Sequence, residues 1–326
     1  MSRKVLVTVP FTDEQKKQLS AAGKEYGDSF IFSEDESVID REVEDADGII
    51  GNVSPEKLRR AGKLTWMQLN SAGADVYAKE GVVPDQAVLT CATGSYGTAL
   101  SEYMVCMLLV MMKRIPQYLE NQKNGIWRDE GPVTTPAGKR ILVVGTGDIG
   151  MSFARRIKAF ELPDHPITLA GVRRRTGSCP EPLDEIHSVD ELPEQVAKAD
   201  IIAVSMPGSK ETYHLFDREL LLKCRRGAYL INIGRGTVLD NEALKDPEIS
   251  GRFSGIYIDV CEQEPLPDND PLFRVPNLYI TPHITGTYHL DITVQNIADT
   301  AEHNYRAWHG ECGFKSVVNK KTGYAD

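Results

Sequence analysis

The sequence lacks the features that mark three broad kinds of protein. Its longest wholly apolar run, residues 103–112, is too short to span a bilayer. Lysine and arginine number 37 against 47 aspartates and glutamates, and the resulting net charge of −10 argues against a nucleic-acid surface, which needs clustered cations. No basic and apolar leader precedes the strand-like residues 5–9. These absences predict a cytoplasmic protein that binds neither membranes nor nucleic acids.

Cysteine is present, but its spacing lacks the patterns of metal and redox sites. The six cysteines form no CxxC pair and no metal-ligand spacing with histidines; they are at positions 91, 106, 179, 224, 261 and 312. We therefore expect no metal site, and cysteines that are reduced, mostly buried and without a redox role.

Short apolar strands alternate with helical segments along the chain, which predicts an α/β fold with parallel sheets. A chain of 326 residues exceeds the size at which one core keeps growing, so we expect two domains. The first group of expected strands is 5–9, 47–51, 66–69 and 88–90. The second group is more continuously apolar, as in a sheet covered on both faces; it comprises 141–144, 167–172, 201–204, 229–233, 256–260 and 278–281.

Two long helical stretches and one loop complete this outline. Residues 99–122 predict one helix that is apolar on most faces up to Met112. Such a helix must be buried inside one subunit or between two. We interpret it as a dimerisation helix, with Trp127 on an arm that embraces the partner. A second helix is expected at about 290–308. Residues 176–193, rich in Pro, Glu and Asp, predict a surface loop.

A glycine-rich turn stands between the strand 141–144 and an amphipathic pattern with Phe153, Ile157 and Phe160. In a dinucleotide-binding turn the first glycine permits the tight bend, the second lets the backbone approach a pyrophosphate, and the third lets helix and strand pack closely. The helix N-terminus offers N–H groups to the phosphate. The alternative is a strand-to-helix turn without a ligand. The turn consists of Gly145, Thr146, Gly147, Asp148, Ile149 and Gly150.

Three further segments each place one charged or titratable side chain after an expected strand: Arg235, Glu264 and His283. A guanidinium can hold a carboxylate by two parallel hydrogen bonds and polarise an adjacent ketone. Histidine can protonate a carbonyl oxygen as hydride reaches the carbon, and a nearby carboxylate favours the imidazolium. Taken alone, each would more often be an ordinary loop residue. Downstream of the glycine turn, they predict hydride chemistry on a small carboxylic acid.

The order and spacing of these segments resemble the D-isomer-specific 2-hydroxyacid dehydrogenases over nearly the whole chain. The resemblance implies a flavodoxin-like, substrate-binding domain from residues 1–98 plus 290–326 and a Rossmann-like, dinucleotide-binding domain from residues 99–289. It places the active site in the cleft between them. The long helix then begins the second domain, in a homodimer.

The resemblance also assigns roles to residues. Arg235 is the carboxylate clamp, and His283, paired with Glu264, is the proton donor. Ser71, Ala72 and Gly73 would hold the substrate carboxylate through backbone N–H groups, unless they form a plain turn. Asp259 would accept a hydrogen bond from the nicotinamide, unless it caps a loop. Other cofactor contacts would come from Gly145, Gly147, Asp148, Ile149, Gly150, Pro207, Ile233 and Gly234.

Two departures refine the prediction. Residues 93–102 lack the Gly-x-Asn of many members and look like the branch containing glyoxylate and hydroxypyruvate reductases. After the second strand of the nucleotide domain, Arg173 and Arg174 stand where an NAD enzyme usually has an acidic residue. Arginines suit a 2′-phosphate, which favours NADP, with NAD possible; a solvated basic turn is the alternative.

The leading interpretation is thus an NADP-preferring reductase of glyoxylate, hydroxypyruvate, pyruvate or a similar 2-oxo acid. Formate dehydrogenases resemble the fold but use Gln beside the histidine, so Glu264 disfavours them. A dinucleotide-sensing corepressor is the alternative from another class. It would need a peptide-docking surface, and no long disordered tail is evident. Tyr77, Tyr96 and Tyr288 either contribute to the substrate pocket or pack.

Overall fold

The computed structural model describes residues 2–325, which form two units. Unit 1 contains the chain up to Tyr96 and again from Tyr288 onward, and unit 2 contains Gly97–Thr287. The boundaries predicted from the sequence each lie two residues from these positions. Each unit has its own parallel sheet, which confirms the α/β class.

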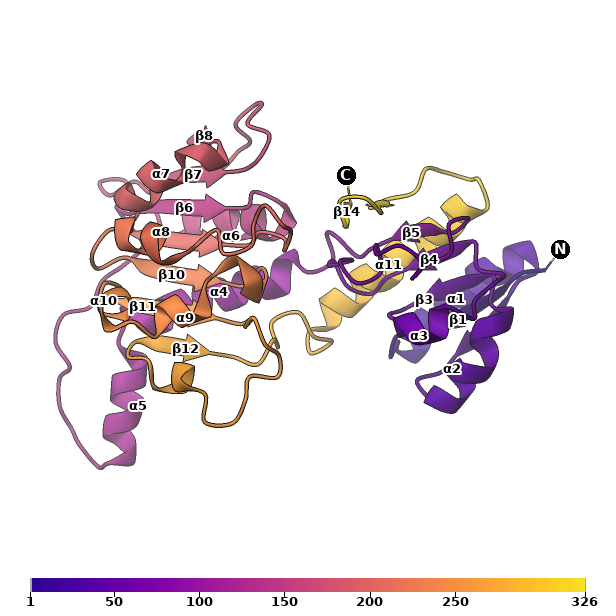
Figure 1. Ribbon diagram of the computed structural model, residues 1–326, viewed down its shortest axis with the longest axis horizontal. Coiled ribbons are helices and arrows are strands. Elements are labelled where there is room, and N and C mark those ends of the chain that lie inside the picture. Colours follow the sequence, from indigo (N-terminus) through magenta and orange to yellow (C-terminus); the bar gives the residue numbers. More distant parts are fainter. Residues whose placement is uncertain (1, 326) are drawn as a thin grey trace. The chain divides into compact units, whose positions relative to one another are not determined.

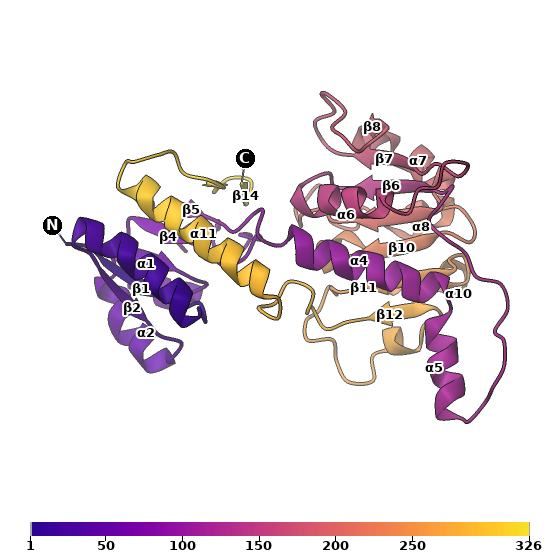
Figure 2. The ribbon, with the colours of Figure 1, turned by 180° about the vertical axis from the view of Figure 1, so that it is seen from behind.

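Unit 1 is built on a sheet in the order β2-β1-β3-β4-β5, which is the flavodoxin-like order. Its parallel strands are β1 (Lys4–Val7), β2 (Ser29–Phe32), β3 (Gly48–Ile50), β4 (Trp66–Gln68) and β5 (Val88–Thr90). Helices α1 (Asp13–Tyr26) and α11 (Asp291–Trp308) cover one face, and α2 (Glu36–Glu42) and α3 (Pro55–Leu58) the other (Figure 1, Figure 2). A short ribbon, β13 (Val318–Asn319) with β14 (Tyr324–Ala325), follows α11.

The strand register of unit 1 explains its core. Leu6, Ile49, Met67 and Leu89 are aligned across β1, β3, β4 and β5, so their side chains lie on one face. They pack with α2 and α3 in one buried cluster. The sequence did not predict β2, because this four-residue edge strand is only partly buried and carries little apolar signal.

Unit 2 has a sheet in the order β12-β11-β10-β9-β6-β7-β8, with all pairs parallel. The order reverses between β6 and β9, the kind of position at which open α/β sheets bind ligands. The strands are β6 (Arg140–Val144), β7 (Thr168–Val172), β8 (Glu185–His187), β9 (Ile201–Val204), β10 (Tyr229–Asn232), β11 (Gly255–Ile258) and β12 (Leu278–Ile280).

Helices cover both faces of the unit 2 sheet, which is why its central strands are buried throughout (Figure 1, Figure 2). On one face lie α4 (Gly97–Met112) and α6 (Asp148–Lys158); on the other lie α7 (Leu192–Lys198), α8 (Arg218–Lys223), α9 (Asn241–Leu244) and α10 (Pro247–Ser250). The 3-10 turns are η1 (Val43–Asp45), η2 (Val189–Glu191), η3 (Gly236–Val238) and η4 (Pro271–Arg274). None of the described helices combines the length and apolarity needed to cross a membrane.

The prediction of a single helix over residues 99–122 is wrong in one respect, because the helix is interrupted between Met112 and Ile115. Helix α4 ends at Met112, Arg114 takes a left-handed conformation with φ of 56°, and α5 (Ile115–Lys123) begins with Pro116 in its first turn. Proline lacks an N–H and clashes with the preceding turn, so it starts a new helix rather than continuing the old one. Helix α5 projects from unit 2, and a long loop returns the chain to β6 (Figure 2).

The loop predicted over 176–193 is also wrong in part, because it contains β8, η2 and the start of α7. Strand β8 is short and polar, and side chains secure it. Arg140 donates two hydrogen bonds to Glu185, of 2.9 and 2.7 Å. These bonds, and another from His187, lower the pKa of Glu185 to about 2. A polar edge strand of this kind carries no apolar periodicity by which the sequence could reveal it.

Candidate active site

The glycine turn lies at the carboxyl end of β6, beside the point where the strand order reverses. Gly145 has φ of +95°, a conformation that side chains rarely adopt. A Cβ on Gly150 would lie 2.0 Å from the carbonyl oxygen of Gly145, so only glycine lets α6 approach the turn. Nothing lies within 4 Å of a Cβ position on Gly147, and helix α6 begins directly after it, at Asp148. The turn thus has the geometry of a phosphate-binding loop.

The two arginines after β7 differ in their surroundings. The Arg173 side chain donates hydrogen bonds to the carbonyls of Thr176 and Ser178, at 2.7 and 2.6 Å, and so holds the following loop in shape. Arg174 is exposed. No acidic residue occurs in residues 171–176. Of the two, Arg174 is therefore the freer to meet a ligand phosphate.

The segment that carries Arg235 follows β10 and is tightly fixed. The buried Asn232 side chain accepts from the Gly234 N–H at 3.1 Å and donates to the Arg235 carbonyl at 3.1 Å. A Cβ on Gly236 would lie 2.0 Å from the Cys261 carbonyl, so the segment packs against the loop after β11. The arginine side chain is half-buried and donates to the Gly234 carbonyl at 3.0 Å.

Two other predicted cofactor residues flank this segment. Ile233 is buried, and its N–H donates to Val204 at the end of β9. Pro207 follows β9 and is exposed. Both lie at the carboxyl edge of the sheet, as the glycine turn and Arg235 do.

Glu264 and His283 come together although 19 residues separate them. His283 Nδ1 lies 2.7 Å from one carboxylate oxygen of Glu264, and the other oxygen accepts the Cys261 N–H at 2.9 Å. The backbone of His283 has φ of +52° and its N–H donates to the Asp259 carbonyl at 2.8 Å. With Nδ1 engaged by the carboxylate, Nε2 is the ring nitrogen that can face a ligand. Both side chains are partly exposed.

Asp259 is almost completely buried, at 2% exposure, and organises the loop after β12. Its carboxylate accepts four hydrogen bonds, from the Thr281 hydroxyl, the Ile284 N–H, and both the N–H and the hydroxyl of Thr285. A carboxylate offers about four acceptor positions. The nicotinamide contact that the resemblance implies would have to share these acceptors. In the structure, the Asp259 carboxylate holds the loop after β12 in place.

Ser71, Ala72 and Gly73 lie in unit 1, in the turn that follows β4. Among residues 2–325, no acceptor is found for their backbone N–H groups. The turn is braced by Asn52, whose side chain accepts the Asn70 N–H at 3.2 Å and donates to the Ser71 hydroxyl at 3.1 Å. Asn52 was not predicted from the sequence, although its position just after β3 was a usable signal.

A polar cluster between the loops of unit 2 was also not predicted from the sequence. His214 Nε2 lies 3.0 Å from Glu262, which also accepts the Asn241 N–H at 3.0 Å, and Asp240 caps α9. Ligand atoms of His214, Asp240 and Glu262 lie within 4.8 Å of one another, close enough to hold a metal ion. The hydrogen bonds of Glu262 to His214 and to the Asn241 N–H tie the loops after β9, β10 and β11 together.

A further expectation from the sequence concerns the cysteines. All six cysteines are free, but only Cys91, Cys224 and Cys261 are buried, so the prediction that most are buried is wrong. Burial, assisted by nearby carboxylates, raises the pKa of Cys261 to about 11, so this thiol beside Glu264 stays protonated.

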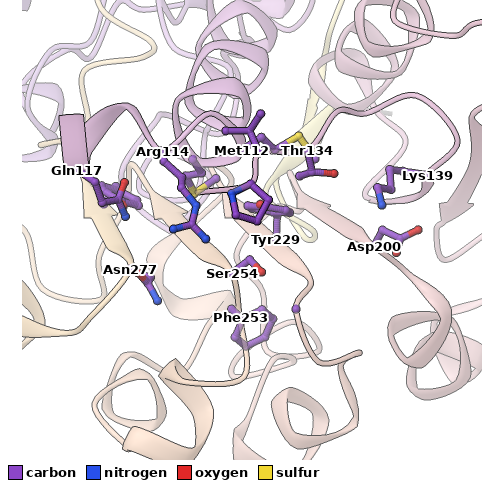
Figure 3. Close-up of a pocket in the computed structure, with 15 residues that line it drawn as sticks. Met112, Arg114, Gln117, Thr134, Lys139, Asp200, Tyr229, Phe253, Ser254 and Asn277 are labelled. Carbon is purple, nitrogen blue, oxygen red and sulfur yellow. The ribbon is translucent and has the colours of Figure 1, made fainter. Parts of the chain in front are cut away.

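A cavity of about 610 Å³ lies at the opposite edge of the sheet, between Arg114, Tyr229 and Asn277, and contains none of the predicted catalytic side chains (Figure 3).

Comparisons with known proteins agree with this geometry. Residues 105–285 match the family described as D-isomer specific 2-hydroxyacid dehydrogenase, NAD binding domain. A glyoxylate reductase of Thermofilum pendens is 33% identical over 256 residues, covering 76% of this chain and 74% of the relative. A glyoxylate/hydroxypyruvate reductase B of Pectobacterium carotovorum subsp. carotovorum is 30% identical over 254 residues, covering 75% of this chain and 77% of the relative.

A solved structure is similar over almost the entire chain. It is a D-isomer specific 2-hydroxyacid dehydrogenase from Xanthobacter autotrophicus Py2 in complex with NADPH and MES, with 25% identity, a TM-score of 0.81, and coverage of 99% of this chain and 100% of that one. The fold and the site define an oxidoreductase that uses a nicotinamide dinucleotide. The chain belongs to the D-isomer-specific 2-hydroxyacid dehydrogenase family. Its similarity extends to the glyoxylate/hydroxypyruvate reductase branch, as the sequence predicted.

Proposed function

We propose that this protein reduces a small 2-oxo acid, such as glyoxylate or hydroxypyruvate, to the 2-hydroxy acid, with NADPH as the preferred cofactor. The observation that carries the proposal is the pairing of His283 Nδ1 with Glu264 at 2.7 Å, at the same sheet edge as Arg235 and the glycine turn. The names of the relatives support the substrate class.

Each residue has a defined task in this proposal. The nicotinamide cofactor, when bound, supplies the hydride. Arg235 holds the substrate carboxylate and draws electron density from the adjacent carbonyl. His283 delivers the proton from Nε2 to the carbonyl oxygen, so that C2 gains a hydrogen and the oxygen becomes a hydroxyl. Glu264 orients the imidazole and stabilises its charged form. In the reverse direction neutral His283 is the base.

Residues of both units contribute to binding in this proposal. The glycine turn and the start of α6 would hold the cofactor pyrophosphate, with further contacts from Pro207, Ile233 and Gly234. In unit 1, the backbone N–H groups of Ser71, Ala72 and Gly73, for which no acceptor is found among residues 2–325, would bind the substrate carboxylate.

A panel of 2-oxo acids assayed with NADPH and NADH separately tests this function. We expect turnover of glyoxylate or hydroxypyruvate. A pure, folded protein that binds the dinucleotide but turns over none of the acids would contradict the proposal and favour a dinucleotide-sensing binding protein.

The same panel tests cofactor preference. NADPH should be preferred over NADH by about tenfold or more in kcat/KM, because charge-assisted hydrogen bonds to the 2′-phosphate contribute about 1.5–3 kcal/mol each. Changing Arg173 and Arg174 together to alanine should weaken NADPH use strongly and NADH use slightly. Arg174→Ala alone should produce much of this loss, since Arg173 is engaged with loop carbonyls.

The matched control for these variants is Arg226→Ala, which removes an exposed arginine that precedes β10 at the opposite edge of the sheet. It should change neither cofactor's kinetics. A wild type that favours NADH, or equal losses with both cofactors, would show that the arginines form only a solvated turn.

We further propose that the protein is a homodimer formed through α4, α5 and the loop after α5. The uncovered apolar side chains of this region include Leu119, Ile126 and the fully exposed Trp127. Polar bonds nevertheless keep the loop ordered: Arg114 donates to the Glu130 carbonyl and Asn121 to the Glu130 side chain, both at 2.6 Å. An ordered, apolar surface of this kind is typical of an interface.

Trp127→Ala should therefore weaken dimerisation by about thirtyfold, corresponding to about 2 kcal/mol for a buried aromatic anchor. Sedimentation velocity over a concentration series measures this shift. Phe273→Ala, which removes another exposed aromatic ring of unit 2, is the control and should leave the association unchanged. A wild type that is monomeric at every concentration would exclude the dimer.

A further inference from the structure

A hydrogen-bond network surrounds Asn70, the residue directly before the donor turn of Ser71, Ala72 and Gly73. The Asn70 carbonyl accepts the Tyr96 hydroxyl, and its side-chain NH₂ donates to the Tyr288 hydroxyl. Its backbone N–H is held by Asn52. All these residues belong to unit 1, so the network fixes the Tyr288 hydroxyl close to the turn.

The two tyrosine hydroxyls use their hydrogen-bonding capacity differently. A phenol has one proton to donate and can also accept. Tyr96 is buried and donates its proton to Asn70, so its hydroxyl is engaged in holding the turn. The Tyr288 hydroxyl instead accepts from Asn70, and no acceptor for its own proton is found among residues 2–325. Its side chain is 37% exposed, which leaves that proton accessible to a ligand.

The protonation state of Tyr288 supports its assignment as a hydrogen-bond donor. Burial raises the pKa of Tyr288 above its ordinary value, so the phenol remains a donor at neutral pH. The third tyrosine considered from the sequence, Tyr77, packs its ring against the core of unit 1, and burial raises its pKa to about 12. Its packing role was one of the two predicted alternatives.

We propose that Tyr288 determines substrate specificity by donating a hydrogen bond to a polar substituent on C3 of the 2-oxo acid. This inference rests on the proposed function. If the substrate carboxylate binds the N–H groups of Ser71, Ala72 and Gly73, the adjacent Tyr288 hydroxyl is within reach of the far end of a three-carbon acid. Hydroxypyruvate carries a hydroxyl at C3, pyruvate a methyl group in the same place, and glyoxylate has no C3.

A site that donates to a substrate hydroxyl discriminates against the analogue that lacks it, because the protein group is then left without its partner. The proposed contact thus predicts that hydroxypyruvate is the best substrate of the three acids. Tyr288→Phe removes the donor and retains the ring.

The experiment compares kcat/KM for hydroxypyruvate, pyruvate and glyoxylate in the wild type and three variants. Tyr288→Phe should lower the value for hydroxypyruvate by about tenfold, the upper range for one neutral hydrogen bond, and change the other two less than twofold. Tyr96→Phe should lower all three alike, since it loosens the turn that holds every substrate's carboxylate.

Tyr26→Phe is the matched control, because it removes another hydrogen-bonded phenol hydroxyl of unit 1, the one that donates to Glu311. It should leave all three values unchanged. An unaltered preference for hydroxypyruvate over pyruvate in Tyr288→Phe would overturn the inference while leaving the proposed function intact. A wild type that reduces none of the three acids would overturn both.

Discussion

Replacement of His283 by alanine should lower kcat for 2-oxo acid reduction by about 10²- to 10⁴-fold, the usual contribution of a positioned general acid. The reason is geometric. Nδ1 is engaged by Glu264 at 2.7 Å, and Glu264 is itself fixed to the Cys261 N–H, so Nε2 is held ready to deliver a proton. Steady-state kinetics measure the loss, and fluorescence titration should show that NADPH still binds. Near-normal turnover would remove His283 from the mechanism.

Glu264→Gln tests the partner of this histidine through kcat for 2-oxo acid reduction. The carboxylate of Glu264 contacts His283 Nδ1 at 2.7 Å and fixes the orientation of the ring. The neutral amide is a weaker hydrogen-bond acceptor than the carboxylate, so kcat should fall while the Kd for NADPH should change little.

Glu262→Gln is the matched control for that experiment. Glu262 is two residues away but bonds to His214 rather than His283. Its substitution should leave kcat unchanged. An unchanged kcat in Glu264→Gln, or an equal loss in both variants, would assign no role in proton transfer to Glu264.

Arg235→Lys should lower kcat/KM for the 2-oxo acid by about a hundredfold, on the order of 3 kcal/mol, through a higher KM and a lower kcat. Lysine keeps the charge but cannot form the two parallel hydrogen bonds of a guanidinium with a carboxylate. The Kd for NADPH should change little, because the Asn232 side chain and the close packing of Gly236 also hold the segment in place. Near-normal kinetics for the acid would exclude the clamp.

Much of this architecture is local and could be predicted from the sequence. The central strands of unit 2 are continuous apolar runs because helices cover both faces, so their positions were found to within two residues. The glycine turn was identified because the positive φ of Gly145 and the close approach of Gly150 to its carbonyl each require glycine. In these places a single residue type is the only one that fits.

Elements with weak local signals were missed or misjudged. Strands β2 and β8 are short edge strands, partly exposed, and the second is secured by the Arg140 to Glu185 hydrogen bonds rather than by apolar burial. The break at Arg114 was missed because its neighbours on both sides form helices, and the proline in the first turn of α5 was a signal that went unused. Local propensity is too weak to fix such points.

The sequence by itself determined the fold class, the family and the identity of the polar residues after each strand. Only the tertiary structure decided how those residues are used. It showed that the Asp259 carboxylate is occupied by the loop of His283, and that Asn70 meets Tyr288 across 218 residues. A side chain's partners depend on which distant segments the packed sheet brings to its edge, and no local pattern records that choice.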